Sequence, residues 1–165
     1  MCFRTNCTNS RVTALGFSED ATFLVVGWAG GMVQVHRLSS KPEKLGEGAH
    51  HRTAVTAVAA APKGQAFASA DDSGQIVLWG KNGQKQTVAN ASGRGVKSLL
   101  FLGDQALAAG CADGTVKIVN PTSGAIIAAH SLGTAAVTAL AFARDKVALA
   151  AGTQSGQVTM LALDA

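Results

Sequence analysis

The sequence predicts an all-β protein in which one four-stranded unit is repeated four times. Four apolar clusters begin with a valine, at Val12, Val55, Val96 and Val137. A glycine follows each valine 18 or 19 residues later, and an alternating apolar run such as Gln75-Ile-Val-Leu-Trp79 comes directly after it. These glycines lie 43, 40 and 42 residues apart. A period near 40 residues with several short strands is typical of blades that stack around an axis, as in a β-propeller.

The strands and turns of one repeat can be placed in order along the chain. In the second repeat we expect strands at 55–60, 66–70, 75–79 and, more weakly, at 85–91, because Pro or Gly residues in the turns separate these apolar runs. Ala-rich pieces such as 57–61 and 106–109 are too short for helices and favour strands. The repeats span about 10–49, 50–92, 93–132 and 133–165, and an extended N-terminal strand is expected over 1–9.

Composition excludes several classes of protein. The 165 residues are 47% hydrophobic and 15% charged, so the chain has the material for one folded domain and is not disordered. No apolar run reaches the roughly 18 residues that a membrane span needs. The N-terminus has no apolar core of a signal peptide, which predicts an intracellular protein, cytoplasmic or nuclear.

Cysteine usage and motifs predict neither metal, cofactor nor catalytic chemistry. Three cysteines, Cys2, Cys7 and Cys111, with no CxxC spacing support neither a disulfide framework nor a zinc site. No GxSxG, HExxH or paired-carboxylate motif is present. The stretch Gly93–Ser98 resembles a phosphate loop only superficially, since it lacks the GK[ST] ending and precedes a strand. We therefore expect no enzyme and no cofactor.

The repeats resemble the WD40 family over about residues 10 to 163. In the second repeat His51, Ser69 and Trp79 stand at the His, Ser/Thr and Trp positions of the family's hydrogen-bond network. The turn Asp of that network would fall at position 73, which is Ser73. In the other repeats the Trp position holds His36, Val119 or Leu161, so we expect a complete network in no repeat. Another β-propeller or a β-sandwich is the alternative fold.

The number of repeats leaves two architectures open. WD40 rings usually have seven blades and often close by joining an N-terminal outer strand to the last three strands. One hypothesis is a small ring that is closed by pairing of residues 2–8 with residues 157–163. An arc cut from a larger propeller, with open sides that favour further blades or another chain, is the one we prefer.

Basic residues are the main reason to consider nucleic acid. The net charge is +4, and Lys81, Lys85, Arg94 and Lys97 follow one another with no acid between Ser73 and Gly103. The blade pattern puts Lys81 and Arg94 at opposite rims, and aromatic stacking partners are missing, so a phosphate-tracking stripe is not favoured.

The resemblance implies a protein-interaction scaffold that presents the loops of one rim. That rim would carry the blade connections and the turns between second and third strands. Trp28 and the Arg residues are of the types that most often carry interface energy. The expected partner-binding residues are Arg11, Trp28, His50, Arg52, Asp71, Asp72, Arg94 and Asp113. Rival functions are an RNA-associated WD40 protein of ribosome biogenesis and, less favoured, a small propeller hydrolase or lectin.

Overall fold

Four antiparallel sheets make up the computed structural model, which describes residues 4–91, 94–145 and 147–163. Blade 1 contains β1 (Val12–Phe17), β2 (Phe23–Trp28), β3 (Met32–Arg37) and β4 (Glu43–Ala49). Blade 2 contains β5 (Val55–Ala60), β6 (Ala66–Asp71), β7 (Gln75–Gly80) and β8 (Lys85–Asn90). Blade 3 contains β9 (Val96–Phe101), β10 (Leu107–Cys111), β11 (Thr115–Val119) and β12 (Ile126–Ser131). Blade 4 has only three strands in the described residues, β13 (Val137–Ala143), β14 (Ala148–Thr153) and β15 (Val158–Ala162).

The second repeat forms the strands that its sequence predicts. β5 has the predicted bounds, and the other three strands differ from them by a residue at one end. Gly64, Gly74 and Gly83 have φ angles of 63°, 90° and 70°, a backbone conformation that glycine adopts without steric cost. The Ala-rich pieces 57–61 and 106–109 contribute to β5 and β10 and not to helices. Pattern and turn chemistry therefore predict the blade correctly.

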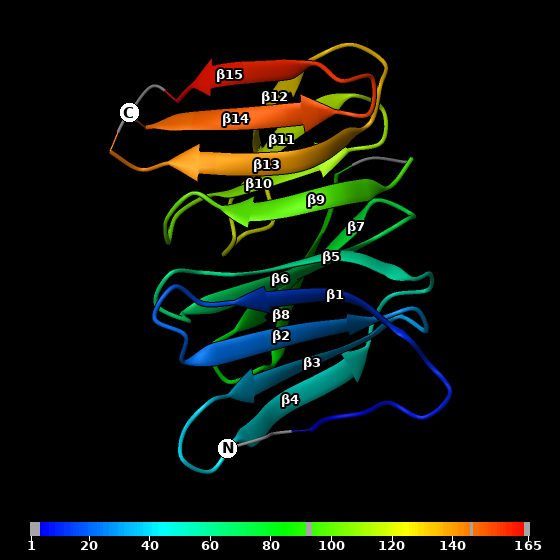
Figure 1. Cartoon of the computed structure of the whole chain (residues 1–165), viewed down its shortest axis with the longest axis vertical. Coiled ribbons are helices and arrows are strands. Elements are labelled where there is room, and N and C mark those ends of the chain that lie inside the picture. The colour runs from blue at the N-terminus through cyan, green and yellow to red at the C-terminus, as the bar shows by residue number, and fades with distance from the viewer. Residues whose placement is uncertain (1–3, 92–93, 146, 164–165) are drawn as a thin grey trace.

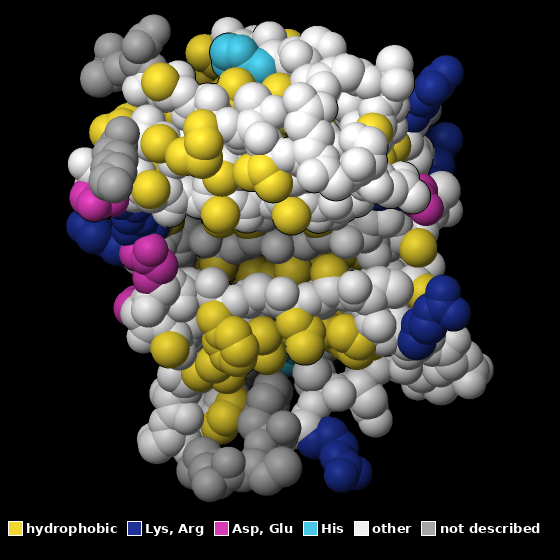
Figure 2. All heavy atoms as spheres, turned by 45° about the horizontal axis from the view of Figure 1, so that its top comes forward, with side chains coloured by type: hydrophobic (Ala, Val, Ile, Leu, Met, Phe, Trp, Pro, Cys, Tyr) yellow, Lys and Arg dark blue, Asp and Glu magenta, His cyan; other side chains and the backbone are white. Residues whose placement is uncertain are grey.

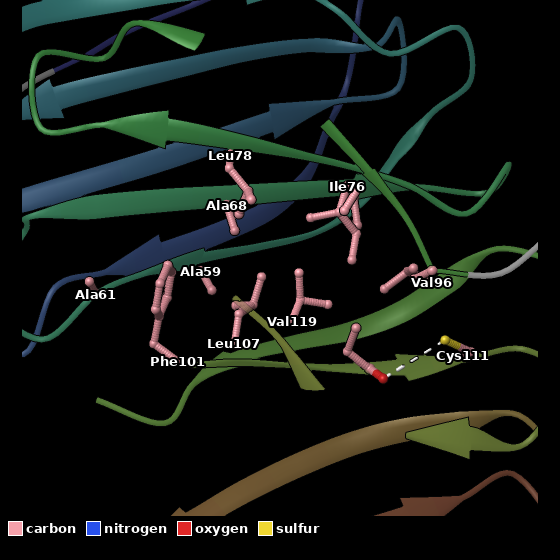
Figure 3. Close-up of a cluster of buried hydrophobic side chains, with 14 residues drawn as sticks. Ala59, Ala61, Ala68, Ile76, Leu78, Val96, Phe101, Leu107, Cys111 and Val119 are labelled. Carbon is pink, nitrogen blue, oxygen red and sulfur yellow. Dashed lines mark hydrogen bonds between the residues drawn. The ribbon is translucent and has the colours of Figure 1, made fainter. Parts of the chain in front are cut away.

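Neighbouring blades pack face to face with the same geometry at each junction. The first strand of a blade contacts the first and second strands of the preceding blade, as β5 does with β1 and β2. Each of the three junctions has its own cluster of buried apolar side chains. Between blades 2 and 3, Ala68, Ile76 and Leu78 face Phe101 and Leu107 (Figure 3). The core is therefore divided among the junctions, as expected for repeat units that cannot bury their faces alone.

The four blades form an open arc. Blades 1 and 4 lie at opposite ends of the molecule and show their sheets face-on, while strands of blades 2 and 3 recede behind them (Figure 1). The sheets do not close, so the arc reading is confirmed and the small closed ring is not. Within the described residues, 4–8 form no strand and lie against blade 1, where Oγ1 of Thr5 donates to Oε1 of Gln34 at 2.8 Å. The expected strand over 1–9 is therefore wrong for its described part.

One ion pair joins the two end blades across the concave side of the arc. Nη2 of Arg144, just after β13, lies 2.6 Å from Oε1 of Glu19, just after β1. Both side chains are about half exposed. They border a small pocket lined by the first strands of blades 1 to 3. The concave side is thus a shallow, partly polar groove.

Candidate interaction rim

One rim of the arc is built from two kinds of segment. The connections between blades lie at this rim just before each first strand. The turns between the second and third strands lie at the same rim. Backbone hydrogen bonds join the two, for example from N of Ala112 to O of Gly95 at 2.9 Å and from N of Ala29 to O of Arg11 at 2.9 Å. The rim loops are therefore held by the sheets and by each other.

In blade 2 a buried network of side chains fixes the rim. Nε1 of Trp79 donates to Oγ of Ser69 at 2.9 Å, and this hydroxyl lies 2.7 Å from Nε2 of His51. Nδ1 of His51 lies 3.0 Å from Oδ2 of Asp71. The other oxygen of Asp71 accepts hydrogen bonds from the backbone N–H groups of Ser73 and Gln75. The network thus ties the blade connection to the turn and to β7.

The order of donors in this network follows from the carboxylate. An ionised Asp71 can only accept hydrogen bonds. Nδ1 of His51 therefore carries the imidazole proton and donates a hydrogen bond to the Asp71 carboxylate. Nε2 then accepts from the hydroxyl of Ser69, whose oxygen in turn accepts from Trp79. Every polar side-chain atom of this four-residue network has a hydrogen-bond partner, which is what buried polar groups require.

The same three residues, Ser69, His51 and Asp71, have the hydrogen-bond order of a catalytic triad. A nucleophile must reach a substrate, yet Ser69 and Asp71 are fully buried and His51 is 5% exposed. The oxygen of Ser69 is also engaged by the indole N–H of Trp79. The arrangement can therefore stabilise the blade but cannot present a nucleophile to a substrate.

Burial shifts the pKa of both ionisable members of the network. Burial lowers the pKa of His51 and outweighs the opposing effect of Asp71. Burial raises the pKa of Asp71, but hydrogen bonds from Ser73, His51 and Gln75 together outweigh it, so the pKa of this carboxyl lies below its usual value. At neutral pH the pair is a neutral imidazole and a carboxylate.

Two of the predicted partner-binding residues are not on the surface. Trp28 ends β2 and is 1% exposed, and it lies on the same face of blade 1 as Gln34, which accepts a hydrogen bond from Thr5. Asp71 belongs to the buried network just described. These two predictions are wrong, since position in a hairpin fixes which rim a residue lies on but not whether its side chain reaches solvent. Conversely, the network expected to be incomplete in every repeat is complete in blade 2, with Asp71 in place of a residue at 73.

The sequence contains a signal for the role of Asp71. Successive side chains of a strand alternate between faces, so Ser69 and Asp71 share one face of β6, and His51 in the preceding blade connection contacts both. The family spacing counted back from Trp79 points to position 73 and is independent of this alternation. The sequence pattern does not indicate the position of Lys97, whose Nζ lies 2.5 Å from Oδ1 of Asp72 across the junction of blades 2 and 3.

The remaining predicted residues lie at the rim. Arg11, Arg52 and Arg94 are exposed in the segments that precede the first strands of blades 1, 2 and 3. His50 is exposed and packs its ring against Trp79, with ring centroids 5.3 Å apart. Asp113 is half-buried and accepts from N and Oγ1 of Thr115, so it shapes its own turn.

The basic run of the sequence does not form one patch. Lys81 lies in the turn after β7, at the rim opposite Arg94, as predicted.

Among the described residues no group of three or more His, Cys, Asp or Glu side chains could hold a metal ion. No helix in the described part of the chain is long and apolar enough to cross a membrane.

Comparisons with known proteins agree with this geometry. The family model of the anaphase-promoting complex subunit 4 WD40 domain matches residues 61–145, just over half of the chain. No curated protein sequence matches the chain. The crystal structure of the computationally designed Ika4 protein is 24% identical, with a TM-score of 0.81 over 98% of this chain and 96% of that one.

Two longer solved chains also match. The computationally designed Ika8 protein is 25% identical, with a TM-score of 0.76 over 92% of this chain and 46% of that one. A chain in the crystal structure of the mitotic checkpoint complex is 23% identical, with a TM-score of 0.81 over 94% of this chain and 50% of that one. The chain thus spans about half the length of these two.

Proposed function

Because this chain belongs to the WD40 domain family, we propose that it is a non-catalytic scaffold whose rim binds a partner protein through Arg11, Arg52 and Arg94. Members of this family generally serve as protein-interaction scaffolds. The observation that supports the rim is the recurrence of an exposed arginine at the corresponding connection of three successive blades. Arginine suits such a role because its planar guanidinium binds carboxylates with two parallel hydrogen bonds.

The charge balance of the rim favours an acidic partner surface. Asp72 is paired with Lys97, and Asp113 is engaged by the backbone and hydroxyl of its own turn. Exposed arginine side chains thus stand at the rim beside acids that already have contacts within the chain. The buried network of His51, Ser69, Asp71 and Trp79 supports the proposal, because it holds the connection before Arg52 in one conformation and so lowers the entropy cost of binding.

Affinity purification with mass spectrometry tests the proposal. The immobilised chain is compared with a double variant, Arg52→Glu and Arg94→Glu, and with a control, Lys63→Glu and Lys81→Glu, at the opposite rim. Proteins captured by the wild type and the control should be lost from the rim variant. Equal capture by all three proteins would contradict the proposed rim.

A nuclease step separates the RNA-associated alternative. If capture depends on RNA, it disappears after nuclease treatment, and direct binding of labelled RNA falls steeply with salt concentration. Capture that survives nuclease but is lost in the rim variant supports direct protein binding.

A further inference from the structure

Blade 1 exposes the apolar side chains that the other blades bury in their junctions. Val12, Leu15 and Phe17 of β1 are 50%, 63% and 60% exposed. The residues at the position of Val12 in the three following blades are 0% exposed: Val55, Val96 and Val137. The residues at the positions of Leu15 and Phe17 are buried or half-buried against the preceding blade in five cases, Val58, Leu99, Leu140, Ala60 and Phe101, and the sixth, Phe142, is half-buried. Blade 1 therefore carries a complete junction surface with no blade on it.

Blade 4 carries the opposite kind of junction surface, the face that would receive the first strand of a following blade, and no blade packs on it. In blades 1 and 3 the first valine of the next blade packs against a glycine of the second strand: a Cβ added to Gly27 would overlap Val55, and one added to Gly110 would lie 2.8 Å from Cγ1 of Val137. The corresponding residue of β14 is Gly152, where an added Cβ would meet only Ala139, at 3.6 Å. The space that a valine fills at the other glycines is open here.

The rest of that face is small and apolar. Cross-strand pairing places on one side of blade 4 a set of alanines with two larger apolar residues at the edge strand: Ala139, Ala141, Ala148, Ala150, Val158 and Met160. Val158 and Met160 are 72% and 63% exposed. A face of small side chains accepts the large side chains of β1 without a clash, as the receiving faces within the chain do.

The junction of blades 2 and 3 has a threonine hydrogen bond whose acceptor is missing at blade 4, whereas Thr13 of blade 1, at the same position, bonds O of Gly27 in its own blade. Oγ1 of Thr56 in β5 donates to the backbone O of Val96 at 2.5 Å, across the junction of blades 2 and 3. Thr138 holds the same position in β13 and is exposed. Its hydroxyl is placed to donate to the carbonyl of a valine that begins another first strand.

The N-terminal segment lies where an outer strand of a preceding blade would lie. Within the chain, Nζ of Lys117 in β11 bonds to O of Ala91, just after the outer strand of blade 2. Gln34 holds the position of Lys117 in blade 1, and its partner is Thr5. Residues 4–8 therefore cover blade 1 as β8 covers blade 3, and blade 4 is the blade whose described residues lack a fourth strand.

Both empty faces point to the same side of the arc. In Figure 1 the sheets of blades 1 and 4 both face the viewer. Figure 2 shows hydrophobic side chains in bands across the middle of the molecule, with Lys and Arg at its margins. The arc also superposes on about half of two longer solved chains, so its curvature is that of half of a larger assembly.

We propose that two copies of this chain close one ring of eight blades, with blade 1 of each copy packed on blade 4 of the other. A two-fold axis makes the two junctions identical and leaves neither face open. In each junction Val12 enters the space at Gly152 of the second copy, and residues 4–8 pair with the free edge of β15. The inference is independent of the rim partners, because the rim variants leave both end faces unchanged.

Sedimentation or light-scattering mass measurements on the purified chain test this ring. The wild type should have twice the monomer mass of 16.7 kDa. Leu15→Glu and Gly152→Val should each halve that mass, since the first puts a charge in the junction and the second fills the receiving space. Neither side chain meets a neighbouring blade in the single chain, so circular dichroism and the thermal unfolding of both variants should show a folded protein.

A matched control is Gln65→Glu, which adds the same charge as Leu15→Glu at an exposed turn of blade 2. This variant should keep the doubled mass. A wild type that stays monomeric at high micromolar concentration overturns the ring and leaves the end faces to further blades or a different protein. Larger open polymers, or a dimer that survives Gly152→Val, would overturn it as well.

Discussion

Ser69 is the residue on which the buried network of blade 2 depends most. Its hydroxyl accepts from Trp79 and donates to His51, and none of the three side chains reaches solvent appreciably. The Ser69→Ala substitution should lower the free energy of unfolding by at least about 2 kcal/mol, because it leaves two buried nitrogen atoms without partners. Urea denaturation of this variant measures the loss. Ser40→Ala, in an exposed bend, is the control and should change stability by less than about 0.5 kcal/mol.

The ionisable residues predict how stability depends on pH. The folded pKa of His51 lies below its unfolded value, so the unfolded state binds the proton more readily and acid favours unfolding. Stability should be complete above about pH 6.5 and decline below it, with a further loss below about pH 4 as Asp71, whose pKa is also lowered, takes up a proton. Denaturation midpoints measured from about pH 8 to about pH 2 show this course.

Burial also lowers the pKa of His36 and of His50, so these groups contribute in the same direction as His51. The His51→Gln variant should therefore show a smaller decline between pH 7 and 5, not a flat profile. A wild type that gains stability on acidification through this range would contradict the assignment.

At the scale of elements, the junction glycines have different roles in different blades. Gly110 and Gly152 hold the same strand position, but only Gly110 faces the valine of a following blade. Gly110→Ala should destabilise the fold by about 1–3 kcal/mol through overpacking, while Gly152→Ala should leave the unfolding free energy of the monomer nearly unchanged. Both are measured in the monomeric Leu15→Glu background. Equal effects at the two sites would show that the junction does not limit residue size.

The elements themselves were predictable because their signals are local. Alternating apolar residues and turn glycines define strands such as β5 and β7 without reference to the rest of the chain. Burial was less predictable, since it depends on what covers a face. Trp28 is 1% exposed at the last position of β2, and no local pattern in the sequence indicates that its side chain is covered. At the rim, the repeat pattern predicted the positions of the arginines correctly, but it did not predict that Asp71 is buried in a hydrogen-bond network.

At the scale of the whole molecule, the arc is a linear stack in which inner blades have two neighbours and end blades one. Stability in such a stack is a sum of blade and junction contributions. Hydrogen exchange of the monomeric Leu15→Glu variant should therefore be slowest in β6 and β7 and fastest in β15, which has an open edge. Mass spectrometry of peptic fragments measures the gradient. Uniform protection in all four blades would indicate that the chain unfolds only as one unit.

The ion pair between Glu19 and Arg144 gives the arc a mechanical property. It is a strut between the first and last blades, and both of its charges are exposed to ions in solution. Dissolved salt weakens such a pair. Because ions screen an exposed pair of this kind, we expect the separation of the two end blades to be held less firmly in strong electrolyte than in dilute buffer.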